Sequence, residues 1–158
     1  MPIPNTFTDA TGRRWPITIS LATVRAVKST HDIDLTRFAI DSSVLTAFED
    51  SCRFSEILGT ILAHDLTREG LTQHDLEQSL SGDAINDAIF ATVRAIRDFL
   101  PEAPRQIASK VVEAMEQAER TRIDLATKTV QSKALDAAYE AAMLQAENDF
   151  DRMLAPKQ

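Results

Sequence analysis

The sequence predicts a mainly α-helical protein with an N-terminal β-hairpin and a long C-terminal helical segment. Apolar and polar residues alternate around Trp15, and apolar side chains recur every three or four residues from Ala84 to Leu100. After Arg105 there is no Gly, and no Pro until Pro156. We therefore expect residues 1–104 to form the hairpin and a helical body. Residues 105–158 are expected to form the long helical segment, within the same domain or as an appendage to it.

The hairpin is predicted where "TFT" and "RWPITI" flank the turn sequence "DATG". Asp9 suits the first position of a turn, and Gly12 tolerates positive φ. One face of the second strand is apolar through Trp15, Ile17 and Ile19. Because an isolated hairpin is marginally stable in water, this face is expected to dock on the helical body. We therefore interpret Trp15 as a core residue rather than an exposed binding anchor.

Helices are expected to follow the hairpin, with breaks between them. Ser20 is a candidate N-cap, and "STHDIDLTRF" interrupts the helical pattern while placing Ile33 and Leu35 toward the core. Ser42 or Ser43 is expected to start the next helix, which carries a broad apolar surface as far as Leu62.

Three positions in this region carry specific expectations. Cys52 lies in the apolar stretch "AFEDSCRFSEIL" and is expected to be a buried structural cysteine rather than a catalytic thiol. Gly59 lowers helix propensity, so we expect it to mark a close packing contact. The segment "HDLTREG" is interpreted as a connector.

Two further helices have clear start and stop signals. Thr72 followed by Asp75 resembles a capping box, and Gly82 is expected to end that helix. Asp83 is expected to begin the next helix, which has a strong amphipathic pattern and stops at Pro101. Phe99 and Leu100, at its end, are interpreted as core residues.

The C-terminal segment carries a narrow, Ala-rich apolar stripe. Its residues step by 4, 3, 4, 4 and 3 positions, a spacing typical of helices that pair, and they are Leu135, Tyr139, Ala142, Ala146, Phe150 and Met153. Two interpretations stay open: the helix folds back on its own domain, or it pairs with another chain. We predict these six residues as partner-binding residues and expect self-association through residues 130–154. The stretch "TKTVQSK" is a weak point, so the sequence leaves open one helix or two.

Charge and composition exclude several classes of function. The net charge of −7 is uneven: residues 41–90 hold two Lys/Arg and ten Asp/Glu, so their net charge is −8. Phosphate binding needs clustered positive charge, so we expect no nucleic-acid partner. No apolar run of about 18 residues exists, so no membrane partner is expected. A single cysteine and no apolar leader segment favour a cytoplasmic location.

Reactive groups do not converge in the sequence. The three histidines, His31, His64 and His74, form no pair at i,i+4 spacing, and the four glycines are scattered singly. Asp32 and Asp34 suit loop capping, because their segment lacks the Gly and terminal Glu of a calcium loop. We therefore predict no catalytic, cofactor-binding or metal-ligating residue, and a protein that is not an enzyme.

The order of motifs resembles that of a known group of proteins. The pattern "F-x-D-x-x-G-R-x-W-x-I-x-I" is followed by "IDL", "EILGTIL" and "GLTQHDLEQSLSGDAINDAIFATVRAIRDFLP". This order resembles the tail assembly chaperones of tailed phages and prophage-like clusters, over roughly residues 7–115. The matched positions include Gly12 and Trp15 in the hairpin, Gly82 and Asp83 at a helix boundary, and Phe99 at a helix end.

The resemblance implies a non-enzymatic role in phage tail assembly. Such chaperones bind the long helical tape-measure protein, recruit tail-tube subunits and leave before the particle is complete. The implied partners are therefore proteins, met in the bacterial or phage-infected host cytoplasm, and the chain is expected to be a homo-oligomer. The alternative is a permanent structural or connector subunit of a virion-like assembly.

Overall fold

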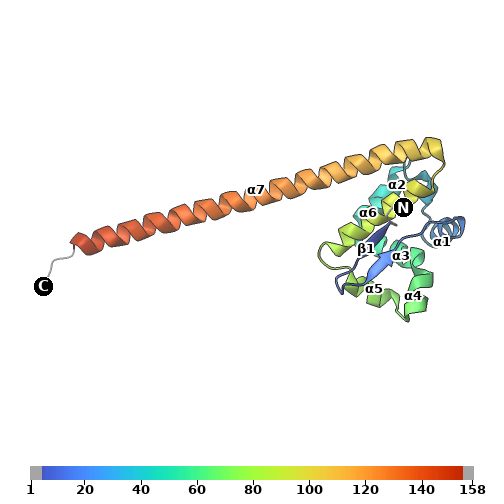
Figure 1. Cartoon of the computed structure of the whole chain (residues 1–158), viewed down its shortest axis with the longest axis horizontal. Helices are drawn as coiled ribbons and strands as arrows, with labels where there is room; N and C mark the ends of the chain where they lie inside the picture. Colours follow the sequence, from blue (N-terminus) through green and yellow to red (C-terminus); the bar gives the residue numbers. More distant parts are fainter. Residues whose placement is uncertain (1–4, 155–158) are drawn as a thin grey trace. The chain divides into compact units, whose positions relative to one another are not determined.

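The computed structural model describes residues 5–154 and is mainly α-helical with an N-terminal hairpin, which confirms the predicted fold class (Figure 1). Its elements are β1 (Thr6–Thr8), β2 (Arg14–Pro16), α1 (Leu21–His31), the 3₁₀ helix η1 (Leu35–Arg37), α2 (Ser42–Glu49), α3 (Ser51–Ile61), α4 (Ala63–Glu69), α5 (Gln73–Ser79), α6 (Ala84–Phe99) and α7 (Glu102–Leu154). The chain divides into two compact units, Met1–Ala114 and Met115–Gln158. The first turns of α7 belong to the first unit, where Ala108 and Val112 are buried.

The hairpin pairs β1 and β2 in antiparallel register, with Phe7 opposite Trp15. Both side chains are buried, as is Ile17, whereas Ile19 is half-buried. Strand β1 contacts α6. The expected docking of the hairpin and the core position of Trp15 are thus confirmed, because the apolar face of the hairpin is covered by the helical body.

Asp9 holds the hairpin turn through four hydrogen bonds. Its Oδ1 accepts from the Thr11 backbone N (2.9 Å), the Thr11 Oγ1 (2.6 Å) and the Arg13 backbone N (3.0 Å). Its Oδ2 accepts from the Trp15 Nε1 at 2.8 Å. Burial raises the pKa of Asp9, but these bonds favour the ionised form more strongly, and the net result is a pKa below its ordinary value.

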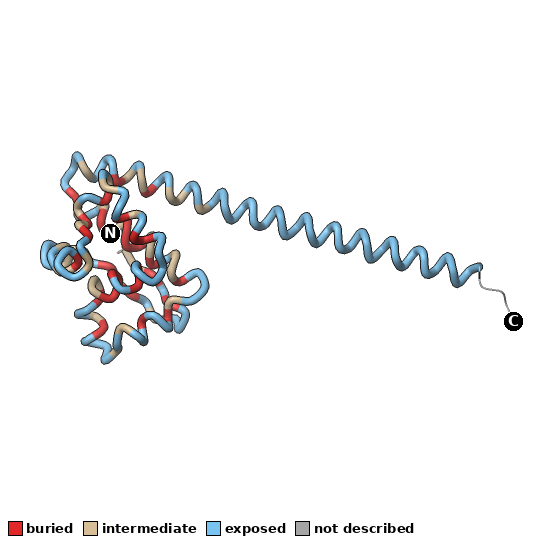
Figure 2. The backbone as a smooth tube through the Cα atoms, turned by 180° about the vertical axis from the view of Figure 1, so that it is seen from behind, coloured by how far each residue is buried: buried red, intermediate tan, exposed pale blue. Residues whose placement is uncertain are grey.

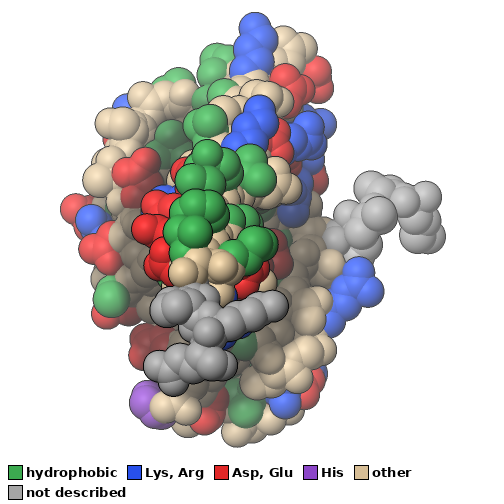
Figure 3. Space-filling view, turned by 90° about the vertical axis from the view of Figure 1, so that its left-hand side faces the viewer, with side chains coloured by type: hydrophobic (Ala, Val, Ile, Leu, Met, Phe, Trp, Pro, Cys, Tyr) green, Lys and Arg blue, Asp and Glu red, His purple; other side chains and the backbone are tan. Residues whose placement is uncertain are grey.

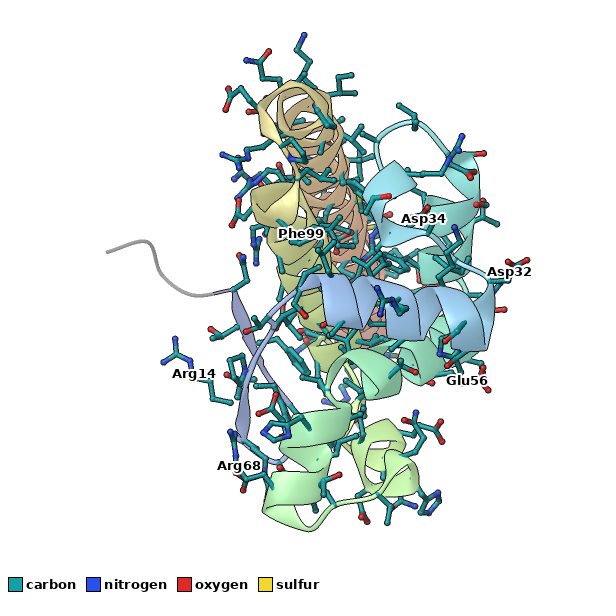
Figure 4. All side chains as sticks on the ribbon, turned by 90° about the vertical axis from the view of Figure 1, so that its right-hand side faces the viewer. Arg14, Asp32, Asp34, Glu56, Arg68 and Phe99 are labelled. Atoms are coloured by element: carbon teal, nitrogen blue, oxygen red, sulfur yellow. The ribbon has the colours of Figure 1, made fainter. Side chains whose placement is uncertain are left out.

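Helix α1 starts and stops as the sequence predicts. The Ser20 side chain accepts a hydrogen bond from the Thr23 backbone N, and the helix ends at Asp32, whose φ of 56° lies in the left-handed region (Figure 4). The chain then places Ile33 and Leu35 in the core. Asp34 caps η1 by accepting from the Thr36 backbone N, and its pKa is lowered chiefly by the hydrogen bond from the Thr36 side chain.

The apolar run from Ser42 to Leu62 forms two helices, with a break at Asp50. The Asp50 carboxylate accepts hydrogen bonds from the backbone N–H groups of Cys52 and Arg53, so it caps the N-terminus of α3 as a separate helix. Phe48 and Phe54, on either side of the break, are buried and meet edge to edge with ring centroids 5.2 Å apart. The prediction that Cys52 is buried is wrong, because this first-turn residue is exposed while the flanking aromatic rings occupy the core.

The interpretation of "HDLTREG" as a connector is also wrong, since its residues form most of α4. Leu66 is buried, and Arg68 pairs with Asp65 at 2.8 Å across one helical turn. Gly70, with a φ of 68°, ends the helix. One buried leucine in a polar segment gave too weak a periodicity to indicate a helix.

The expected close contact at Gly59 is confirmed by the packing of α3 against α5. A Cβ placed on Gly59 would lie 1.6 Å from the Gln73 Oε1. The Gln73 Nε2 donates to the Ser55 backbone carbonyl at 2.9 Å, so the missing side chain of Gly59 leaves room for this bridge. Thr72 and Asp75 form the predicted capping box at the start of α5.

Helix α5 ends three residues before Gly82. The Ser79 carbonyl accepts a hydrogen bond from the Ala10 backbone N at 2.9 Å, which ties the helix end to the hairpin turn. Helix α6 begins after Asp83, but the Asp83 side chain makes no capping bond. At the other end of α6 Leu100 is buried and Phe99 is half-buried, before the chain turns at Pro101 into α7.

Helix α7 is a single helix of 53 residues. The weak point at "TKTVQSK" does not interrupt it, because the segment contains neither Gly nor Pro and its β-branched residues are tolerated in a helix. The open question of one helix or two is thereby answered in favour of one.

We predict that Asp9→Asn lowers the free energy of unfolding by about 2 kcal/mol at pH 7, because an amide cannot accept all four hydrogen bonds. The folded-state pKa of Asp9 is depressed, so its contribution is present above pH 4 and is lost as the pH falls through that pKa. The difference between variant and wild type should therefore shrink between pH 5 and pH 3. Urea unfolding monitored by Trp15 fluorescence measures the free energy of unfolding of the variant and of the wild type at each pH.

Asp83→Asn is the matched control, since Asp83 makes no capping bond, and it should change stability by less than about 0.5 kcal/mol. A gap between Asp9→Asn and wild type that does not change with pH would contradict the assigned role of the Asp9 charge.

Candidate partner-binding surface

The predicted partner-binding residues all lie exposed on α7. Every residue from 120 to 154 is exposed (Figure 2). The four large members of the stripe have exposed fractions of 72% at Leu135, 68% at Tyr139, 60% at Phe150 and 81% at Met153. Ala142 and Ala146 between them are also exposed. All six side chains of the stripe are therefore exposed on the second unit.

The stripe occupies one face of the helix. At 3.6 residues per turn, spacings of 4, 3, 4, 4 and 3 keep the six residues within an arc of about 80°. Large side chains lie toward the ends of the stripe, and Ala142 and Ala146 lie in its middle. Small residues at the centre permit close approach of a second helix, while the larger ones supply contact area.

A shallow hollow of about 560 Å³ overlaps one side of the stripe on the same helix. Its lining residues are Tyr139, Glu140, Met143, Leu144, Ala146, Glu147 and Phe150. One wall is a row at helical spacing that includes Met143 between Tyr139 and Phe150. The other wall consists of Leu144 flanked by two carboxylates, those of Glu140 and Glu147.

The sequence prediction found three residues of this hollow and missed four. Tyr139, Ala146 and Phe150 belong to the predicted stripe. The missed residues are Glu140, Met143, Leu144 and Glu147. Met143 was detectable, because it follows Tyr139 by four positions and precedes Phe150 by seven. Glu140 and Glu147 were not detectable, because a search for apolar residues at helical spacing ignores charged residues.

The composition of the segment favours a helix by itself. Residues 134–146 contain six alanines, and Ala has the highest helix propensity. A helix of this length also has many hydrogen-bonded turns for one nucleation event. The apolar side chains are therefore held in register on one face before any partner binds.

Two of the histidines make hydrogen bonds to neutral polar side chains, one between helices and one within a helix. The His31 Nε2 lies 2.7 Å from the Thr60 Oγ1, and the His74 Nε2 lies 3.0 Å from the Gln78 Nε2. Within residues 5–154 no group of three or more His, Cys, Asp or Glu side chains is arranged to hold a metal ion. In the same part of the chain no helix combines the length and apolar character needed to cross a membrane.

A second hollow, of about 350 Å³, lies between the hairpin turn and α5, where Asp9, Arg13 and Asp75 line it. Both carboxylates already accept structural hydrogen bonds, in the turn and in the capping box. The Arg13 guanidinium lies over the Trp15 ring, 5.6 Å from its centroid. These polar groups serve the local fold of the hairpin and α5.

Comparison with known protein families, with curated proteins and with solved structures found no match for this chain.

We predict that replacing Leu135, Tyr139 and Phe150 together by Gln changes the stability of the first unit by less than about 0.5 kcal/mol, because all three are exposed. Trp15 is the only tryptophan, so its fluorescence during urea unfolding reports on that unit alone. Phe54→Ala, at a fully buried position, is the contrasting control and should cost about 3–5 kcal/mol. A loss above about 1 kcal/mol in the triple variant would mean that the stripe packs on its own chain.

Proposed function

We propose that this protein is a non-enzymatic tail assembly chaperone that binds a helical client through the exposed stripe of α7. The observation that carries the proposal is the apolar stripe from Leu135 to Met153, whose side chains are exposed on the second unit. Apolar side chains at helical spacing are the contact surface by which amphipathic helices bind each other.

The physical properties of α7 fit a carrier of apolar helices. An exposed row of Leu, Tyr, Phe and Met attracts another apolar surface, since burial gains roughly 25 cal/mol per Å². The same property promotes aggregation unless the carrier is charged. A net charge of −7 opposes such aggregation while the stripe stays open to a client.

The identity of the clients rests on the resemblance of residues 7–115 to tail assembly chaperones. The implied clients are a tape-measure-like protein and tail-tube subunits, met in the bacterial or phage-infected cytoplasm. A permanent connector subunit is the alternative, since an exposed helix can equally dock in a finished assembly. Purified particles separate the two: a chaperone is lost from them, and a connector stays.

We predict self-association through residues 130–154, because two copies can cover each other's stripe. A chain truncated before Val130 should have the mass of one monomer by light scattering, whereas the full chain should be larger. Removing only residues 155–158 is the control and should leave the mass per particle at the full-length value. An unchanged oligomeric mass after truncation at Val130 would remove the claim.

We also predict that co-expression with this protein raises the soluble fraction of a tape-measure-like partner with long amphipathic helices. The variant with Gln at positions 135, 139 and 150 should lose this effect, because it lacks the apolar contact area. Solubility is measured by centrifugation of the lysate and quantification of the partner. A partner whose solubility is the same with wild type, variant and empty vector would refute the chaperone role.

A further inference from the structure

The charge of α7 changes along its length. Residues 105–130 contain five Lys/Arg and four Asp/Glu, so their charges nearly cancel. Residues 131–154 contain two Lys/Arg and five Asp/Glu, which gives a net charge of −3. The acidic part coincides with the apolar stripe. Figure 3, which looks toward the C-terminal end of α7, shows hydrophobic side chains gathered there with acidic side chains along their edge.

The two parts of α7 also differ in how their charges are paired. In the earlier part Glu119 binds Arg122 across one turn, with Oε1 and Nη2 2.6 Å apart. In the later part Asp136 and Glu140 are spaced i,i+4, as are Glu147 and Asp151. Like charges at this spacing destabilise a helix. Within residues 5–154 none of these four carboxylates makes an ion pair or hydrogen bond.

The hollow on α7 combines apolar side chains with carboxylates. Met143 and Leu144 offer apolar contact, Tyr139 and Phe150 offer aromatic rings, and Glu140 and Glu147 offer two carboxylates. A Lys or Arg side chain matches this set: its aliphatic stem covers apolar surface, and its charged head reaches the carboxylates at the rim. The aromatic rings add attraction for a cation.

We propose that the partner bound by the α7 stripe is an amphipathic helix whose apolar face is flanked by Lys or Arg. This inference rests on the proposed function and specifies the chemistry of the client. The apolar face of the client covers the stripe, and its basic residues neutralise Glu140 and Glu147 and relieve the like-charge pairs on α7. Charge complementarity of this kind increases the association rate and selects among apolar helices of equal size.

A second copy of the chain is a poorer occupant of the same surface. Pairing two copies through residues 131–154 brings together two segments that each carry a net charge of −3. The repulsion opposes the apolar attraction, so a basic client helix displaces a second copy.

The test uses full-length protein and three designed helical peptides of about 21 residues, or three heptads. The peptides share one apolar face and differ only in the flanking residues, which are Lys, Gln or Glu. Fluorescence anisotropy of the labelled peptides gives the Kd, and circular dichroism confirms equal helicity. We expect affinity to fall in the order Lys, Gln, Glu. Raising the salt should weaken only the Lys peptide, because screening shortens from about 10 Å at 0.1 M to about 3 Å at 1 M.

Variants that neutralise the two carboxylates of the hollow provide a matched test. Glu140→Gln with Glu147→Gln should weaken the Lys peptide about fivefold, the amount expected from two exposed ion pairs, and leave the Gln peptide unchanged. Glu113→Gln with Asp124→Asn removes the same charge elsewhere on α7 and should have little effect.

The outcomes separate the inference from the proposed function. Equal binding of all three peptides would overturn the inference and leave helix binding by the stripe intact. If none of the three peptides binds, both the inference and the proposed function are overturned. Stronger self-association of the Glu140→Gln, Glu147→Gln variant, with no loss of affinity for the Lys peptide, would assign the surface to a second copy and refute the basic client.

Discussion

The N-terminal unit depends on the burial of helix α3. Helices α1, α2, α4 and α5 all contact it, and its side chains Phe54, Ile57 and Leu58 are fully buried. The helices around it have 7–11 residues, a length at which an isolated helix is marginal in water. Their stability therefore comes from packing on α3. Gly59 extends this packing, since only a residue without a side chain leaves room for Gln73.

Beyond its first turns, helix α7 is stabilised in a different way from the short helices around α3. From residue 120 to 154 no side chain is buried, so helix propensity and length maintain the helix without a core. Its apolar side chains are exposed, so they are accessible to a partner. The first unit is thus held by a buried core, whereas the second is a helix with an exposed apolar stripe.

Local rules predicted most of the elements, and their failures have identifiable causes. Caps at Ser20 and Thr72 depend on a few neighbouring residues, so the sequence was sufficient. The break at Asp50 was missed because the apolar periodicity continues across it, and the error placed Cys52 in the core. In α7 the stripe was predicted from its spacing, but the hollow was not. Its second wall contains Glu140 and Glu147, whose role depends on neighbours one turn away.

An apolar stripe beside carboxylates that make no ion pair within residues 5–154 suits reversible binding. Apolar contact alone would bind any amphipathic helix, including a second copy of this chain, and would favour aggregation. Carboxylates along the edge weaken contacts with acidic surfaces and strengthen contacts with basic ones. Exposed ion pairs are individually weak and sensitive to salt, so they add selectivity without making release slow. The proposed chaperone role, in which a client is released to a growing assembly, requires such a balance between apolar contact and charge, and residues 135–153 of α7 carry both kinds of side chain.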